Sequence, residues 1–180
     1  MRPALASPQP VERDEFKASM SRWASGVTVV TTTDPAGRHH GFTASSFTAV
    51  SMVPPMVLVC LDRDAVCAPA FARSPWLGIH VLRRGQEPLA RRFARKDPDK
   101  FAGVELTRAP GIGGVPLLTG VLARLECQVV SRVDGGDHVI LVAEVRRAYD
   151  DGQSAGDPLV YYHRTFHQLG GGPARPAQGQ

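Results

Sequence analysis

Two stretches of the chain have apolar residues at helical spacing. Near the N-terminus, Phe16, Met20 and Trp23 stand at i, i+4 and i+7, which predicts a helix that begins near position 11 and is ended by Gly26. The segment 86–95 has the same period, with basic residues on its other faces. Its inner face carries Leu89, Ala90 and Phe93. Both stretches are predicted to be helices.

The other apolar segments are short, rich in β-branched or aromatic residues, and separated by turn signals, which is typical of strands. Strands are predicted at 27–33, about 38–45, 56–61, 76–82, 121–133, 139–145 and 159–166. The sequences Asp34-Pro-Ala-Gly37 and Asp134-Gly-Gly-Asp137 each predict a turn between antiparallel strands. An irregular short helix is expected at 65–73, a helical turn at 97–101 and a loop at 107–115. Mostly antiparallel strands with a few short helices predict an all-β barrel decorated by helices.

The length and composition indicate one globular domain. The chain has 180 residues, of which 43% are apolar and 21% charged. The domain is predicted to span 11–169, and the flanking segments 1–10 and 170–180 are predicted to be disordered because they are rich in proline, glycine and small residues. Apolar runs such as 53–61 are too short to span a bilayer, and no secretory signal is evident. A soluble cytoplasmic protein without a membrane partner is expected.

The charge and the cysteines narrow the classes of ligand. The formal charge of +4 at pH 7 suits an anionic ligand such as a dinucleotide. The arginines are scattered and not interleaved with aromatic residues, so nucleic acid is not an expected partner. Cys60, Cys67 and Cys127 are odd in number and stand in apolar surroundings without a Cys-x-x-Cys pair. They are expected to be reduced, buried thiols.

The stretch from Gly41 to Ser51 is the clearest candidate for a binding site. Five of its eleven residues carry hydroxyls: Thr43, Ser45, Ser46, Thr48 and Ser51. Small hydroxylated residues beside a glycine can present backbone N–H and side-chain O–H groups to one anion, and phosphate is the commonest such anion. The alternative is a serine- and threonine-rich hairpin between two strands, with its hydroxyls facing solvent.

Other familiar site patterns are absent or incomplete. No Ser–His–Asp, Cys–His or nucleophile-elbow pattern stands out. The glycines of Gly111-x-Gly113-Gly114 do not form a dinucleotide loop, because Pro116 follows and no suitable helix comes next. His163 and His167 share a face whether the segment is helix or strand, but no third ligand accompanies them, so no metal site is expected.

Short motifs follow one another along the chain from about 16 to 169. The first are Gly26-Val-Thr-Val-Val-Thr-Thr, His40-Gly-Phe-Thr-Ala-Ser-Ser-Phe and Ser51-x-x-Pro-Pro-x-Val-Leu-Val-Cys-Leu. They continue with Leu89-Ala-x-x-Phe-Ala94, Asp99-Lys-Phe101, Pro116-Leu-Leu-x-Gly120, Leu125-Glu-Cys127, Gly136-Asp-His138 and Tyr162-x-Arg-x-Phe166. In this order the motifs resemble the flavin reductase family, small enzymes that supply reduced flavin to two-component monooxygenases. No single motif is diagnostic, and the ordered set carries the resemblance.

The resemblance implies an FMN-binding split β-barrel with Greek-key-like connections and an NAD(P)H:flavin oxidoreductase activity. In such an enzyme a hydride passes from nicotinamide C4 to flavin N5, so the protein supplies stacking geometry and hydrogen-bond donors rather than the reacting atoms. The implied cofactors are FMN or FAD, with NADH or NADPH as co-substrate. The implied partners are a flavin-dependent monooxygenase, which receives the reduced flavin, and a second copy of the chain in a homodimer.

The same resemblance gives candidate roles to particular residues. Ser45 and Ser46 are expected on the phosphate side of the flavin, and Lys100 is expected to balance phosphate charge. His138 is expected to be the catalytic residue of the nicotinamide half, where it orients NADH and does not donate the proton. The expected flavin contacts are Thr43, Ala44, Ser45, Ser46, Ser51, Cys60, Leu61, Lys100 and Phe101.

Each of these roles has a plainer alternative. The segment 59–61 can be simple core, Lys100 a solvated surface lysine, and His138 a solvated turn residue. Arg164 is left open between an ion pair with a carboxylate and a contact with the ligand. For the whole protein, the alternatives are a flavin-binding electron carrier without nicotinamide activity and a relative of pyridoxamine-phosphate oxidase on a similar barrel. Rapid NADH oxidation with added flavin favours the reductase, and tightly bound flavin without NADH oxidation favours the carrier.

Overall fold

The predicted strands form the body of the molecule, and three helices are placed around it. The computed structural model describes residues 9–97, 99–150 and 156–169. Its helices are α1 Arg13–Met20, α2 Ala68–Arg73 and α3 Glu87–Ala94, with one 3-10 turn, η1 Ile112–Gly114. Its strands are β1 Ser25–Gly26, β2 Thr28–Thr33, β3 His39–Ala44, β4 Thr48–Met52, β5 Pro55–Asp62, β6 Trp76–Val81, β7 Ala123–Gly135, β8 His138–Asp150, β9 Val160–Tyr162 and β10 Thr165–His167.

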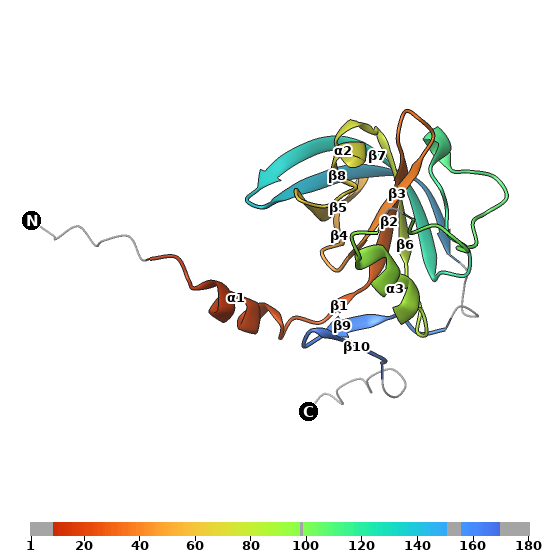
Figure 1. The fold of residues 1–180 in the computed structure, drawn as a ribbon. Coiled ribbons are helices and arrows are strands. Elements are labelled where there is room, and N and C mark those ends of the chain that lie inside the picture. The colour runs from red at the N-terminus through yellow and green to blue at the C-terminus, as the bar shows by residue number, and fades with distance from the viewer. Residues whose placement is uncertain (1–8, 98, 151–155, 170–180) are drawn as a thin grey trace, which may run out of the picture.

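The strands pair antiparallel in two sheets. The larger sheet has the order β3-β2-β6-β7-β8-β5-β4, and the smaller has the order β1-β9-β10. Figure 1 shows the larger sheet strongly twisted, with β7 and β8 as a long hairpin along it. The register of this hairpin shifts between Glu126 and Cys127 and between Val129 and Ser131, and such bulges allow a strand pair to bend. The expected all-β architecture with a few short helices is confirmed.

Two apolar cores lie on opposite faces of β2. Val30 belongs to the core inside the curled sheet, together with Phe42 of β3 and Phe71 of α2. Its neighbour Val29 belongs to the second core, which α3 covers with Phe93. Successive side chains of a strand point to opposite faces, so β2 is buried on both sides. This explains why its sequence is a continuous β-branched run.

A glycine allows α3 to lie directly on β3. A Cβ atom on Gly41 would stand only 2.7 Å from Cε1 of Phe93, which is fully buried. One turn earlier in the helix, the backbone oxygen of Ala90 accepts a hydrogen bond from Thr43 Oγ1 at 2.6 Å. The helix is therefore fixed to the face of β3 that leads into the hydroxyl-rich stretch.

Most of the predicted elements are confirmed, with small shifts at their ends. The first helix is α1, but it ends at Met20, and Trp23 lies beyond it. Helix α3 buries Ala90 and Phe93, as its sequence predicts. Pro69 lies in the first turn of α2, where a missing backbone N–H leaves no helical hydrogen bond unmade.

Three expectations about local structure are wrong. The segment 159–166 is not one strand, because β9 and β10 are joined by a two-residue turn at His163 and Arg164. The segment 48–52 forms β4, a strand outside the predicted set, which pairs with β5. The described residues of 97–101 contain no helix, and the chain turns at 100–103 instead.

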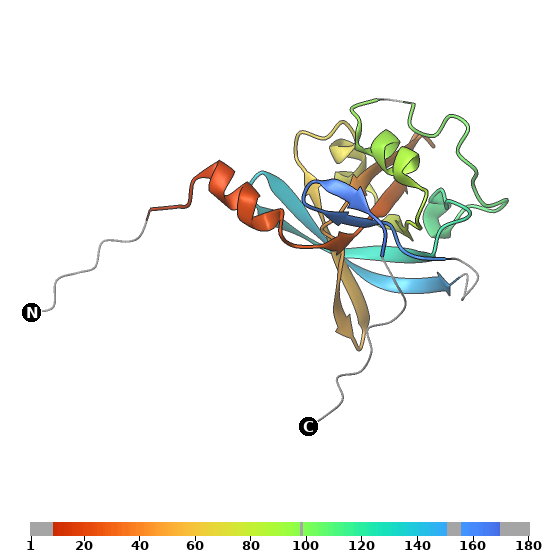
Figure 2. The same ribbon diagram turned by 90° about the horizontal axis from the view of Figure 1, so that it is seen from below.

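Helix α1 lies apart from the sheets and buries none of its residues. Both views show it projecting from the body of the molecule (Figures 1 and 2). The tails predicted to be disordered fall at 1–8 and 170–180 outside the described residues. No helix in the described part of the chain is long and apolar enough to cross a membrane.

Candidate functional site

Ser45 and Ser46 line a groove between the end of β3, the N-terminal segment and the β9–β10 hairpin. This groove has a volume of 780 Å³, and a second groove of 340 Å³ lies between β3, α3 and the same hairpin. Ser45, Tyr161 and Arg164 line both, and the two together are called the serine groove. Figure 2 shows the hairpin between α1 and α3. The volumes are typical of sites for small molecules.

The hydroxyls of the Gly41–Ser51 stretch do not all face a ligand. The hydroxyl of Thr43 is bonded to α3, as described above. Ser46 Oγ accepts a hydrogen bond from the backbone N–H of Cys60 at 3.0 Å, which ties this loop to β5. Ser45 is exposed, and its side chain has no hydrogen bond to the described residues. Ser45 therefore carries a hydroxyl that can bind a ligand in this groove without losing a bond to the protein.

Cations line the serine groove, and none of the described residues that line it is an aspartate or glutamate. The cations are Lys17 of α1, Arg91 of α3 and Arg164 of the β9–β10 turn. Lys17 Nζ lies 3.7 Å from a carboxylate oxygen of Asp14, and the Arg91 guanidinium lies 4.9 Å from the centre of the Phe166 ring. A groove with cations, a free hydroxyl and no lining carboxylate favours an anion such as phosphate.

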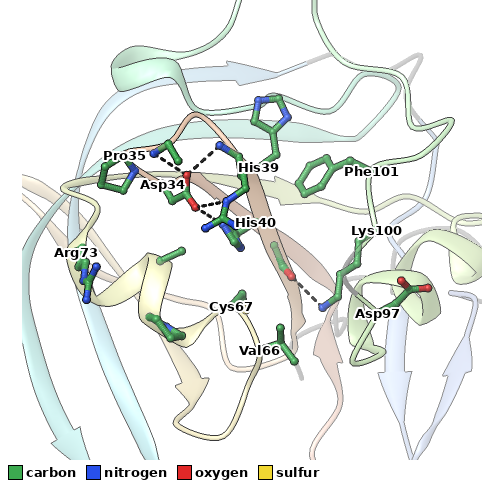
Figure 3. A pocket seen from close by; sticks show the side chains of 15 residues that line it. Asp34, Pro35, His39, His40, Val66, Cys67, Arg73, Asp97, Lys100 and Phe101 are labelled. Carbon is green, nitrogen blue, oxygen red and sulfur yellow. Dashed lines mark hydrogen bonds and ion pairs between the residues drawn. The ribbon is translucent and has the colours of Figure 1, made fainter.

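Lys100 and Phe101 line a different cavity, of 610 Å³, beside the β2–β3 turn (Figure 3). Lys100 is buried, and its Nζ donates to the backbone oxygens of Gly41 at 3.1 Å and Phe93 at 2.9 Å. Burial lowers the pKa of this ammonium group. The alternative of a solvated surface lysine is therefore wrong. The structure also separates Lys100 from Ser45 and Ser46, since Lys100 does not line the serine groove.

The charged groups around the β2–β3 turn are paired within the protein. A carboxylate oxygen of Asp34 lies 3.0 Å from His40 Nε2 and accepts a hydrogen bond from Arg38 Nε at 2.9 Å. These bonds, that of His40 first, hold the pKa of Asp34 well below its usual range. On the other side of the cavity, the Phe101 ring meets the His39 ring edge-on, with centroids 5.4 Å apart. Figure 3 shows both contacts in the cavity wall.

Strand β5 directs Cys60 and Leu61 to opposite faces. Leu61 belongs to the core inside the sheet, so its side chain does not reach a ligand. Cys60 is half-buried on the outer face, opposite Ile140 of β8. Ser51 pairs with Met56. Met56 is four residues before Cys60, to which Ser46 is bonded, so Ser51 and Ser46 contact β5 about 13 Å apart along the strand. The structure therefore does not bring Ser51 into the serine groove.

His138 lies at the tip of the β7–β8 hairpin. It stands opposite Asp62 of β5, so its side chain is on the same outer face as that of Cys60. Two residues along β5 and one strand across separate the two backbones by roughly 8 Å. The Nδ1 atom of His138 lies 2.7 Å from Asp137 Oδ1, and this bond lowers the pKa of the exposed Asp137 carboxyl. His138 does not line the serine groove, but it lies one strand beyond β5, to which Ser46 is bonded.

Sequence reasoning gave no role to Lys17, Arg91 or Tyr161, which all line the serine groove. Arg91 and Lys17 have the appearance of solvated helix residues, and only the packing of α1, α3 and the hairpin brings them together. Tyr161 contacts Phe166 edge-on at 5.4 Å, a pairing that depends on the unexpected hairpin. Once the hairpin is known, its cross-strand aromatic pair is the signal that locates this wall.

The described residues include no group of three or more histidine, cysteine, aspartate or glutamate side chains placed to hold a metal ion. His163 and His167 each contact the ring of Tyr162, with centroids 5.6 and 5.7 Å apart. Both histidines thus take part in the packing of the hairpin.

Comparison with known protein families gives a match over most of the chain. A family model described as a flavin reductase like domain matches residues 20–170. The actinorhodin polyketide dimerase of Streptomyces coelicolor is 44% identical, over 92% of this chain and 89% of that protein. The flavin reductase (NADH) of Kitasatospora aureofaciens is 37% identical, over 91% of this chain and 85% of that protein.

Further relatives are named for their partners and ligands. The reductase subunit HsaB of a flavin-dependent monooxygenase from Rhodococcus jostii is 35% identical, over 87% of this chain and 77% of that protein. Among solved structures, the NADH:FAD oxidoreductase SgcE6 of Streptomyces globisporus, in complex with NAD and FAD fragments, superposes with a TM-score of 0.81 at 33% identity. That superposition covers 95% of this chain and 100% of SgcE6.

Proposed function

The chain belongs to the flavin reductase-like domain family, and we propose that it is an NAD(P)H:flavin oxidoreductase. It reduces FMN or FAD with a hydride from NADH or NADPH and supplies the reduced flavin to a partner monooxygenase. The observation that carries the proposal is the serine groove, in which the free hydroxyl of Ser45 lies among three cations and no lining carboxylate. The family match supports the phosphate of a flavin as this anion.

Ser45 and Ser46 have different roles in binding the flavin. Ser45 donates to the phosphate, and Ser46 fixes the loop to β5 through Cys60. When bound, the flavin supplies the N5 atom that accepts the hydride of nicotinamide C4, and water supplies the proton that completes the reduction. The reacting atoms belong to the two nucleotides. The protein therefore contributes by holding the flavin and nicotinamide rings in the orientation that allows hydride transfer.

The outer face of β5 and β8 is the surface on which we place the flat rings. Its side chains Leu58, Cys60, Ile140 and Val142 are half-buried and mostly apolar. His138 lies at the end of this face, where its imidazole orients the nicotinamide nucleotide. Aromatic ring systems bind well to such a surface, since burial of apolar area drives the contact and the imidazole adds direction.

We also propose that the protein is a homodimer. Phe16, Met20 and Trp23 of the N-terminal segment expose apolar surface beside the serine groove, and Met52 and Val53 at the end of β4 are more than four-fifths exposed. Apolar surfaces of this kind commonly mark interfaces. A second copy of the chain would cover them and enclose the groove. The partner monooxygenase is supported by the likeness to HsaB, which is a reductase subunit.

One assay tests the function. Oxidation of NADH and of NADPH is followed at 340 nm with no flavin and with FMN, FAD or riboflavin. We expect oxidation of the nicotinamide nucleotide only when flavin is added, at rates that differ between NADH and NADPH. Flavin that copurifies tightly, with no nicotinamide oxidation under any of these conditions, would instead identify an electron carrier.

A further inference from the structure

The turn between β9 and β10 is made of residues that seldom adopt its backbone conformation. His163 and Arg164 form the whole of this two-residue turn, with φ angles of 51° and 63°. Hairpin turns with two positive φ angles strongly favour Asn-Gly or Asp-Gly, because a Cβ atom is unfavourable in the left-handed region. Stability alone would therefore not select His-Arg here.

Neighbouring contacts hold the turn in this conformation. The N–H of His163 donates to the backbone oxygen of Ser21 at 2.9 Å, which links the turn to the end of α1. The rings of Tyr161 and Phe166 pack edge-on across the hairpin. Strained residues persist where surrounding structure determines them, and they concentrate at ligand sites. The side chains of the turn are thus candidates for a functional role.

Arg164 is the cation of the serine groove that has no partner in the described part of the protein. Lys17 lies near Asp14, and Arg91 stacks over Phe166. No ion pair or hydrogen bond joins the Arg164 guanidinium to any described residue, although it lines both parts of the groove. Ser45, whose hydroxyl is also free, lines both parts as well.

We propose that Arg164 is a specificity-determining residue that binds the phosphate of the flavin, and that the left-handed turn exists to present it to Ser45. This inference rests on the proposed function. A hydroxyl donor without a counter-charge binds phosphate weakly, and a guanidinium adds two parallel, charge-assisted hydrogen bonds. The substrates selected are flavins with a 5′-phosphate or diphosphate, FMN and FAD, over riboflavin, which has none.

The decisive variant is Arg164→Gly. Glycine adopts positive φ without penalty, so this change removes the guanidinium and relieves the turn together. We expect the melting temperature to stay equal or rise, the Kd for FMN to increase at least tenfold, and the Kd for riboflavin to change less than twofold. Arg164→Lys keeps a charge but not the fork, and its FMN affinity should fall between those of Arg164→Gly and the original protein.

The comparison variant is His163→Gly, which relieves the same turn and removes an imidazole that also lines the groove, but leaves the guanidinium in place. It should preserve the ratio of riboflavin to FMN dissociation constants. Equal loss of both flavins in Arg164→Gly, or no loss of either, would overturn the proposal. So would a change of the ratio in His163→Gly as large as that in Arg164→Gly. Arg164→Asn, also suited to positive φ, repeats the measurement if the glycine variant does not fold.

The readout keeps this inference separate from the proposed function. Flavin binding is measured by quenching of flavin fluorescence in the absence of nicotinamide, at two salt concentrations. Loss of a charge contact should also reduce the salt dependence of FMN binding. If NADH is not oxidised but the FMN preference follows Arg164, the reductase proposal fails and the phosphate contact stands. If NADH oxidation is normal and the preference does not follow Arg164, the phosphate contact fails alone.

Discussion

The hydroxyl of Ser46 and the backbone N–H of Cys60 are joined by a hydrogen bond of 3.0 Å. This bond fixes the loop that carries Ser45 to β5, and β5 in turn pairs with the strand that begins at His138. The two halves of the proposed site, for phosphate and for nicotinamide, are thus connected through one strand. Substitutions at Ser45, Ser46 and His138 should therefore affect the phosphate contact, the position of the loop and the nicotinamide contact, respectively.

Ser45→Ala should weaken FMN and leave riboflavin nearly unchanged. The free hydroxyl of Ser45 lies among cations, and a hydrogen bond to a charged phosphate contributes about 1.5–3 kcal/mol. The expected loss of FMN affinity is therefore at least about tenfold. Fluorescence titration with both flavins measures it. Equal losses for FMN and riboflavin would show that the phosphate lies elsewhere.

Ser46→Ala is the control for Ser45→Ala, and it should affect the stability of the protein rather than the phosphate contact. It removes the acceptor for the Cys60 N–H, and an unsatisfied partly buried donor costs about 1–3 kcal/mol of stability. Urea unfolding should reveal this loss, and any decrease in flavin affinity should be similar for FMN and riboflavin. A loss confined to FMN would mean that Ser46 itself contacts the phosphate.

The three cysteines should differ in their rates of alkylation. Burial raises the pKa of the Cys67 thiol and raises that of Cys127 to about 12, where the neighbouring Glu126 adds to the shift. Cys60 is half-buried on the outer face of β5. We expect iodoacetamide to label Cys60 first, FMN to slow that labelling, and Cys67 and Cys127 to react only on unfolding. Mass spectrometry measures each site, and a disulfide between any two would contradict the expected reduced state.

Much of the fold follows from local patterns, and much of the site does not. The β-branched run is sufficient to predict strand β2, and the Gly-Gly signal is sufficient to predict the hairpin of β7 and β8. The turn at His163 and Arg164 has no glycine, asparagine or aspartate, so its sequence gives no sign of the hairpin. The expected flavin contacts lie in separate cavities, and local sequence patterns do not reveal this separation either. Lys100 lies outside the serine groove because its ammonium group donates to two backbone oxygens on other segments of the chain. The periodicity of the sequence does not reveal a contact of this kind.

His138→Ala should affect the nicotinamide half of the site. His138 lies on the outer face of the sheet and outside the serine groove, so KM for NADH should rise while the Kd for FMN changes less. If the imidazole orders the stacked rings, kcat should also fall, by up to ~100-fold for a misplaced pair. Stopped-flow absorbance measures charge transfer and flavin reduction separately. Unchanged NADH binding and reduction rate with a collapse of FMN affinity would place His138 on the flavin side.

Lys100→Met should destabilise the protein without selecting between flavins. The change leaves the backbone oxygens of Gly41 and Phe93 without their donor, at a cost of about 1–3 kcal/mol for each unsatisfied buried group. Thermal unfolding should show the loss. The ratio of riboflavin to FMN affinity should remain that of the original protein. A change of that ratio comparable to the one at Ser45 would restore Lys100 to the phosphate site.

His80 is a buried histidine that the proposed chemistry does not use. It is fully buried in β6, its Nδ1 lies 2.9 Å from the backbone oxygen of Val29, and its Nε2 has no hydrogen-bond partner among the described residues. Burial lowers its pKa from 6.5 to about 4, although the bond to Val29 opposes this shift. The folded protein therefore keeps His80 neutral at pH values where the unfolded chain binds a proton.

The free energy of unfolding should consequently decrease as the pH falls from about 6.5 to about 4. Above this window both states are neutral at His80 and the stability is fully present, and at its lower end about 3 kcal/mol has been lost. His80→Leu should flatten this part of the curve, whatever its effect at pH 7.5. Asp34 provides the contrast, since its depressed pKa gives stability that is lost only as the pH falls below about 3.8. Urea unfolding at half-unit pH steps measures the curve of His80→Leu beside that of the original protein, and a full slope retained in His80→Leu would assign the pH dependence to another group.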